Sequence, residues 1–194
     1  MIQFLGKKWT FIVARLVGGC LLLVYLVDEG NPSFSPLWAA CYIAISLTVA
    51  CVFVGLRLHD RFPQLDRYHF SRVQPLAGQI SENEWIRRKV RHVSSMVRGN
   101  AVLITPAEDG LICVPILIIG ISPISAIIGG AVFGALHLAT YTYLECIGKA
   151  IIYALACVII LPHGVLNIVL GHFVLDVSAA GLLMIFRRRL PSKP

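Results

Sequence analysis

Six long apolar stretches dominate this chain and set what it can fold into. They are Phe11–Val27, Leu37–Leu56, Ala101–Gly120, Ile121–Leu144, Cys146–Leu161 and Val165–Phe186. A helix needs about 20 mainly apolar residues to cross a bilayer, and most of these stretches approach that length. Only 14% of the 194 residues are charged, whereas soluble domains have about 25%. We therefore expect an all-α polytopic membrane protein with about six transmembrane helices in one bundle.

The lysines and arginines predict the orientation of this bundle. Of the 17, nine lie between Arg57 and Arg98, and the others, apart from Arg15, flank helix ends that face the same side. The connections on the opposite side contain Asp28 and Glu29 but neither lysine nor arginine. Because cytoplasmic loops carry an excess of basic residues, we expect an integral protein of a bacterial inner membrane with both termini in the cytoplasm.

On this prediction the chain has four parts. Residues 1–56 form two transmembrane helices, 57–100 a basic cytoplasmic segment, 101–186 a four-helix core and 187–194 a basic cytoplasmic tail. Within the basic segment, Ser81 and Glu84 form a capping box, and apolar residues recur at helical spacing from Trp85. Two interpretations stay open for it. It is an amphipathic helix on anionic inner-leaflet lipids or a solvated basic loop that sets topology, and neither requires nucleic acid.

Ionisable residues inside three of the apolar stretches indicate a site. Glu108 and Asp109 lie in one, His137 in the next, and His172 with Asp176 in the last. Each such group costs about 2.5–3.5 kcal/mol at the bilayer centre on insertion scales, so several in one chain favour a shared function. Helices that run in alternating directions bring these groups to a similar depth. His172 and Asp176, four residues apart, share one helix face.

Small residues beside His137 predict how the site is enclosed. Phe133 and His137 have the same four-residue spacing, and Gly129, Gly130 and Gly134 lie close to them. Glycines in membrane helices let neighbouring backbones approach closely. We therefore expect a second helix to pack against this face.

These residues resemble the CAAX protease and bacteriocin-processing family of intramembrane endopeptidases. That family carries EExxxR, FxxxH and HxxxN/D motifs on successive helices, and the matching segments here are PAEDGLIC, FGALH and HFVLD. The resemblance covers roughly Thr105 to Gly181. The chain departs from the pattern at two positions, because Asp109 replaces the second glutamate and Cys113 replaces the arginine.

The resemblance implies hydrolysis of a peptide bond near the cytoplasmic side of the membrane. Glu108 would be the base that activates water, and His137 would orient that water. His172 and Asp176 would face the carbonyl oxygen, with Asp176 fixing the His172 tautomer. Supporting roles would fall to Asp109 and Phe133.

This interpretation requires no cofactor, and its partners are a peptide or protein substrate and the lipid bilayer. If a metal takes part, the alternative is zinc held by Glu108, His137 and His172. Two other functions stay open. The missing arginine favours a catalytically inactive relative that serves as a membrane scaffold or binds a membrane-protein partner. His137 and His172, on opposing helices, would instead allow a bis-histidine haem protein.

Overall fold

The architecture is helical across the residues that this computed structural model describes, which are 2–28, 33–59, 61–62, 64–65, 101–138 and 141–189. These residues contain no strand, which confirms the all-α prediction. The helices are α1 (Ile2–Asp28), α2 (Pro36–Leu58), α4 (Ala101–Ile119), α5 (Pro123–Leu136), α6 (Tyr143–Ile159), the 3-10 helix η2 (Leu161–His163) and α7 (Val165–Arg189). The predicted capping box and amphipathic stretch of the basic segment lie outside the described residues, as do 190–194.

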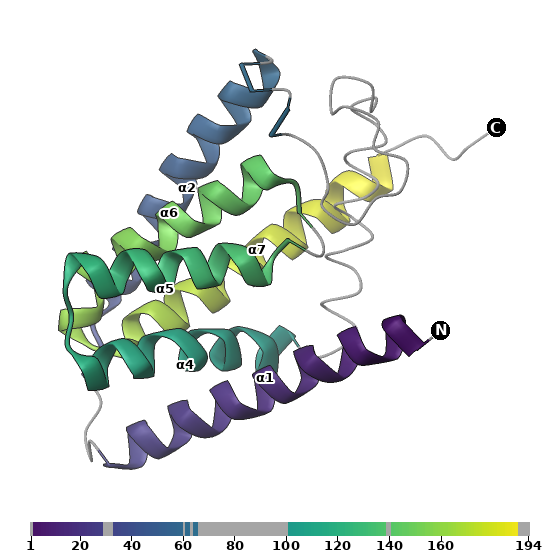
Figure 1. Ribbon diagram of the computed structural model, residues 1–194. Helices are drawn as coiled ribbons and strands as arrows, with labels where there is room; N and C mark the ends of the chain where they lie inside the picture. Colours follow the sequence, from purple (N-terminus) through teal and green to yellow (C-terminus); the bar gives the residue numbers. More distant parts are fainter. Residues whose placement is uncertain are drawn as a thin grey trace.

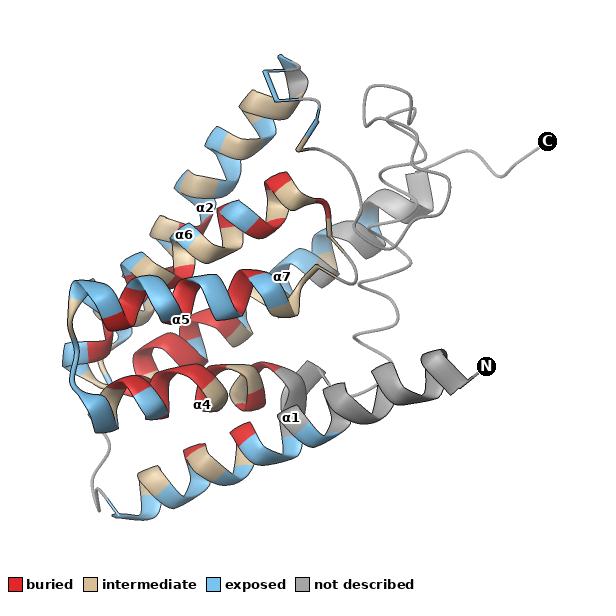
Figure 2. Ribbon diagram, in the orientation of Figure 1, coloured by how far each residue is buried: buried red, intermediate tan, exposed pale blue. Residues whose placement is uncertain are grey.

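The helices run back and forth between two ends of the bundle (Figure 1). The connections from α1 to α2, from α4 to α5 and from α6 to α7 lie at one end, and the start of α1 and the end of α7 lie at the other. Helix α5 packs on α6, α1 on α4, and α7 on both α2 and α4. Buried residues line the inward faces of α4, α5, α6 and α7 (Figure 2). These four helices therefore enclose a common interior.

Glycines set the closest helix pairs, as the sequence predicts. A Cβ added at Gly130 or Gly134 of α5 would collide with backbone carbonyl oxygens of α6. A Cβ at Gly129 would meet isoleucine side chains of α4. Gly18 of α1 and Gly110 of α4 face each other in the same way, each against the other helix's backbone. Larger residues at these positions would force the helices apart.

The α5–α6 region differs from the expected spans. A single helix was expected over Ile121–Leu144, but α5 ends at Leu136 and α6 begins at Tyr143. The backbone N–H of His137 turns back to carbonyls of the preceding turn, and a capping box at Thr142 starts α6. With 14 residues, α5 is about 21 Å long, which is shorter than the hydrocarbon core of about 30 Å. His137 therefore lies at the end of α5 and not inside one continuous helix, as the expected Ile121–Leu144 stretch implied.

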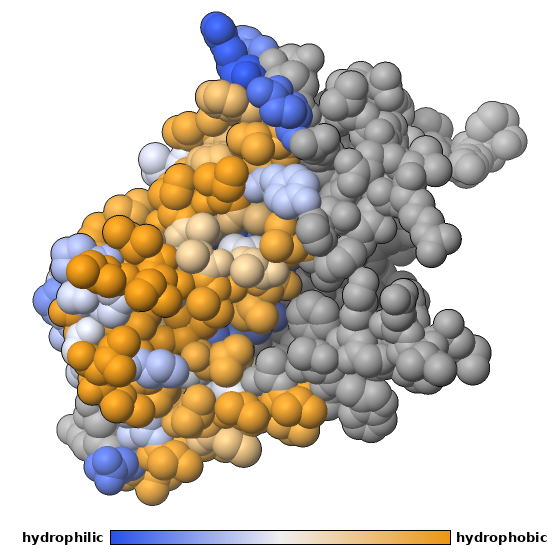
Figure 3. Space-filling model, viewed as in Figure 1, coloured by the Kyte–Doolittle hydropathy of each residue, from blue (hydrophilic) through white to orange (hydrophobic). Residues whose placement is uncertain are grey.

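Apolar side chains cover much of the outside of the molecule. Most of the described surface in Figure 3 is apolar, and many large apolar side chains on the helices are exposed. Among the described helices, one stretch, Pro36–Arg57, is long and apolar enough to cross a membrane by length and composition. Shorter apolar helical stretches are Leu16–Asp28, Pro123–Leu136 and Val165–Ala179.

Candidate active site

The five ionisable residues that the sequence singles out come together inside the bundle. Asp109 of α4 and His172 of α7 lie side by side, with Oδ1 and Nδ1 3.0 Å apart. Glu108 of α4 lies beside His137 at the end of α5, with Oε2 and Nε2 3.9 Å apart. Asp176 lies one turn from His172, with Oδ2 3.6 Å from Nε2. Three helices thus supply two adjoining acid–histidine pairs.

The Asp109 carboxylate is the most enclosed group of the site. It is 0% exposed, and its Oδ1 also accepts a hydrogen bond of 2.7 Å from the Tyr153 hydroxyl of α6. The Cys113 thiol lies 3.2 Å from the same hydroxyl. Within the described part of the chain, Oδ2 has no hydrogen-bond partner. The Tyr153 hydroxyl of α6 and the His172 imidazole of α7 therefore hold this carboxylate, and no arginine of the described residues lies beside it.

His172 is fixed in orientation by this carboxylate. Because a carboxylate only accepts hydrogen bonds, the Nδ1 that faces Asp109 carries a proton. Nε2 then points toward Asp176, whose Oδ2 also accepts a hydrogen bond of 3.0 Å from the Thr105 hydroxyl. Asp109 therefore sets the His172 tautomer, a role that the resemblance gave to Asp176.

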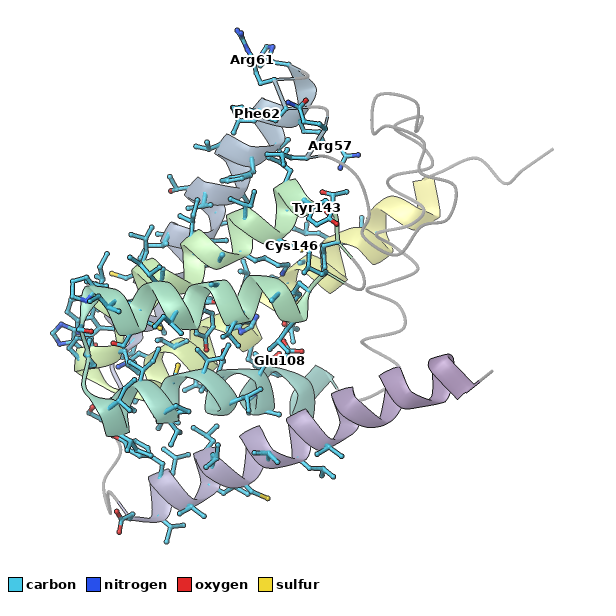
Figure 4. The ribbon with its side chains drawn as sticks, in the orientation of Figure 1. Arg57, Arg61, Phe62, Glu108, Tyr143 and Cys146 are labelled. Atoms are coloured by element: carbon cyan, nitrogen blue, oxygen red, sulfur yellow. The ribbon has the colours of Figure 1, made fainter. Side chains whose placement is uncertain are left out.

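The Glu108–His137 pair is the more accessible of the two. The side chains are 16% and 13% exposed, and Glu108 projects from α4 toward the end of α5 (Figure 4). His137 Nδ1 lies 2.8 Å from the carbonyl oxygen of Phe133 and donates to it, so Nε2 is the nitrogen that faces Glu108. The gap of 3.9 Å between Nε2 and Oε2 is longer than a hydrogen bond.

The Phe133 ring joins the two pairs. Its side chain is buried, and its centroid lies 4.6 Å from the His137 ring and 5.6 Å from the His172 ring. It also stacks on Tyr153 at 4.2 Å. Because this ring contacts both imidazoles, it fills space that a haem held between them would need. The geometry gives the bis-histidine haem alternative no support.

The zinc alternative finds no support either. Over the described ranges, no three histidine, cysteine, aspartate or glutamate side chains are arranged to hold a metal ion. His137 faces Glu108, whereas His172 faces Asp109 and Asp176. The expected ligands are thus divided between the two acid–histidine pairs.

Sequence reasoning missed the contribution of α6. Tyr153 is not among the residues that the sequence singles out, yet its hydroxyl donates a hydrogen bond to Asp109. Lys149, four residues earlier, places its Nζ 4.5 Å from the centroid of the Tyr141 ring and 5.8 Å from that of Phe133. Lys149 and Tyr153 are four residues apart, so they lie on one face of α6. This spacing is the sequence signal that could have identified α6 as part of the site.

The site stands on this geometry alone. No protein-family model, curated protein or solved structure matches the chain.

Proposed function

We propose that the chain is an intramembrane endopeptidase of the CAAX-protease and bacteriocin-processing type. One observation carries the proposal: the residues of the three motif-like segments lie in contact although they come from α4, α5 and α7. The pairs are Glu108 with His137 at 3.9 Å and Asp109 with His172 at 3.0 Å. Such costly groups are retained inside an apolar bundle when they serve a function.

The proposal includes six membrane spans with both termini in the cytoplasm. Two observations support these spans. The outer surface of the helices is apolar, and the α1–α2, α4–α5 and α6–α7 connections all lie at the same end of the bundle. Arg57 and Arg61 lie at the far end of α2 from the α1–α2 connection (Figure 4), on the side that the basic residues predict to be cytoplasmic. The anionic lipid contact of residues 57–100 is part of the same proposal.

The roles follow from the two pairs. Glu108, the more accessible carboxylate, takes a proton from the attacking water, and His137 Nε2 helps to hold that water. Asp109 keeps His172 in one tautomer and so directs Nε2 into the site. The fully buried Asp109 is therefore a positioning residue, and the two neighbouring carboxylates have different tasks.

A catalytically silent scaffold is the second candidate. The observation that favours it is the buried network of Cys113, Tyr153, Asp109 and His172, which links three helices without reaching the surface. Hydrogen bonds of this kind also stabilise membrane bundles that have no activity. A scaffold would retain this network but would not require Glu108 as a base.

The deciding experiment compares the wild type with Glu108→Gln in membranes from cells that lack the native gene. New protein N-termini are quantified by amine labelling and mass spectrometry. We expect a set of termini that forms with the wild type and disappears with Glu108→Gln. The matched control is Asp28→Asn, which makes the same carboxyl-to-amide change at an exposed residue that ends α1. Identical termini in wild type and Glu108→Gln would refute proteolysis and leave the scaffold.

A further inference from the structure

Lys149 is a half-buried cation that neither the motif resemblance nor the acid–histidine pairs use. Its Nζ lies over the Tyr141 ring at 4.5 Å and 5.8 Å from the centroid of Phe133. The same Phe133 ring contacts His137 and His172. The ammonium group therefore shares one aromatic platform with both histidines of the site.

The surroundings of this ammonium are acidic but do not bind it directly. The carboxylates of Asp176, Glu108 and Glu145 and the Tyr141 hydroxyl lie close enough to act on it electrostatically. Yet in the described segments no hydrogen bond or close ion pair of Lys149 is found. An ammonium carries three donors, and in the half-buried Lys149 none of them has a partner among the described residues. These donors are therefore available to a bound group.

The carboxylates of the two acid–histidine pairs cannot supply a donor for this purpose, because they only accept hydrogen bonds. Peptide hydrolysis places negative charge on the carbonyl oxygen, and preorganised donors must hold it. The Asp176 carboxylate accepts hydrogen bonds and already receives one from Thr105. His172 Nδ1 is bound to Asp109, and its Nε2 faces Asp176. Lys149 is the remaining cationic donor close to the two pairs in the described structure.

We propose that Lys149 is the oxyanion donor of this site, an inference that rests on the proposed peptidase function. The oxygen of water attacks the carbonyl carbon while its proton passes to Glu108, and the π-electron pair moves onto the carbonyl oxygen. The Lys149 ammonium holds that oxyanion. When it collapses, the C–N bond breaks and its electron pair takes the proton from Glu108. The products are a carboxylic acid and an amine.

The first test measures anion binding and needs no substrate. Purified protein in lipid nanodiscs, with 13C-labelled lysine, is titrated with dibutylphosphinate, a tetrahedral anion that resembles the intermediate. We expect a saturable shift of the Lys149 side-chain resonance, assigned with Lys149→Arg, and no shift with the neutral methyl ester of the probe. Affinity in every variant is measured from the 31P resonance of the probe. Lys149→Met should weaken binding at least about tenfold, whereas Arg57→Met, which removes a cation paired with Glu145, should not. Equal affinity in Lys149→Met and wild type would overturn the proposal.

The second test uses a substrate found through Glu108-dependent cleavage. Loss of an oxyanion donor typically lowers kcat by about 10²–10³-fold, so Lys149→Met should do so with little change in KM. Lys149→Arg should retain more of kcat than Lys149→Met, a rescue that a purely structural role does not predict. Equal kcat in Lys149→Met and wild type would reject Lys149 while proteolysis stands. If no cleavage depends on Glu108, the peptidase proposal fails, and the phosphinate titration still decides whether Lys149 binds an anion.

Discussion

The hydrogen bond between Tyr153 and Asp109 gives the sharpest test of the buried network. Tyr153→Phe removes the hydroxyl, and with it the contacts to Asp109 and Cys113, but keeps the ring that stacks on Phe133. Both partners are fully buried and their oxygens lie 2.7 Å apart. Hydrogen bonds to charged groups contribute about 1.5–3 kcal/mol, and measured side-chain hydrogen bonds in a membrane protein reach about 1.7 kcal/mol. We therefore expect a coupling free energy of about 1.5 kcal/mol, where these ranges meet.

The measurement is a double-mutant cycle on the free energy of unfolding. Tyr153→Phe, Asp109→Asn and the double variant are unfolded reversibly with SDS in mixed micelles. The cycle removes the effects of each substitution on the rest of the bundle and leaves the pairwise free energy. A coupling below about 0.5 kcal/mol, the level expected of independent sites, would show that the tyrosine hydroxyl does not hold the carboxylate.

Three further predictions concern packing and buried polar groups, each checked by the same unfolding measurement. Gly134→Leu places a side chain against the α6 backbone and should lower the free energy of unfolding by about 1–3 kcal/mol. The control is Gly55→Ala, in an open position of α2, which should change that free energy by about 1 kcal/mol or less. Asn167→Ala removes a buried amide that accepts from the Ser35 N–H and should cost about 1–3 kcal/mol, so wild-type stability would contradict that role. Cys113→Ser keeps a small polar atom beside the Tyr153 hydroxyl and should leave the free energy of unfolding nearly unchanged. Cys113→Arg buries a long cation in a filled position and should lower that free energy by more than about 3 kcal/mol.

Helix bounds could be predicted wherever the apolar stretch ends at strong local signals. The expected Leu37–Leu56 helix differs from α2 by one or two residues, because a proline occupies its first turn and basic residues follow its end. The α5–α6 turn escaped prediction because the residues from His137 to Leu144 are apolar enough to continue a span. A capping box at Thr142 nevertheless starts a new helix there.

The sequence could predict which ionisable residues form the candidate site, but not which carboxylate faces which histidine. The spacing identified the five ionisable residues, and the structure brings them together. The sequence places Glu108 and Asp109 side by side, yet successive residues of a helix point about 100° apart. Which of them faces the interior depends on how α4 is rotated against its neighbours, and tertiary packing decides that. Asp109 turns toward α6 and α7, and Glu108 turns toward the end of α5.

Under the proposed function, Cys113 of α4 stands where the motif has an arginine, and the cation beside the site comes from α6 instead. A residue at position 113 follows Asp109 by one helical turn, so an arginine there would serve the carboxylate from the same helix. With Cys113 in that place, Tyr153 reaches Asp109 from α6, and Lys149 on the same face of α6 supplies the nearby cation. The site therefore depends on how closely α6 packs against α5, a distance set by glycines of α5. Those glycines serve the proposed chemistry as much as the fold, because any residue that separates α5 from α6 also moves Lys149 away from the Phe133 ring and from the two histidines beside it.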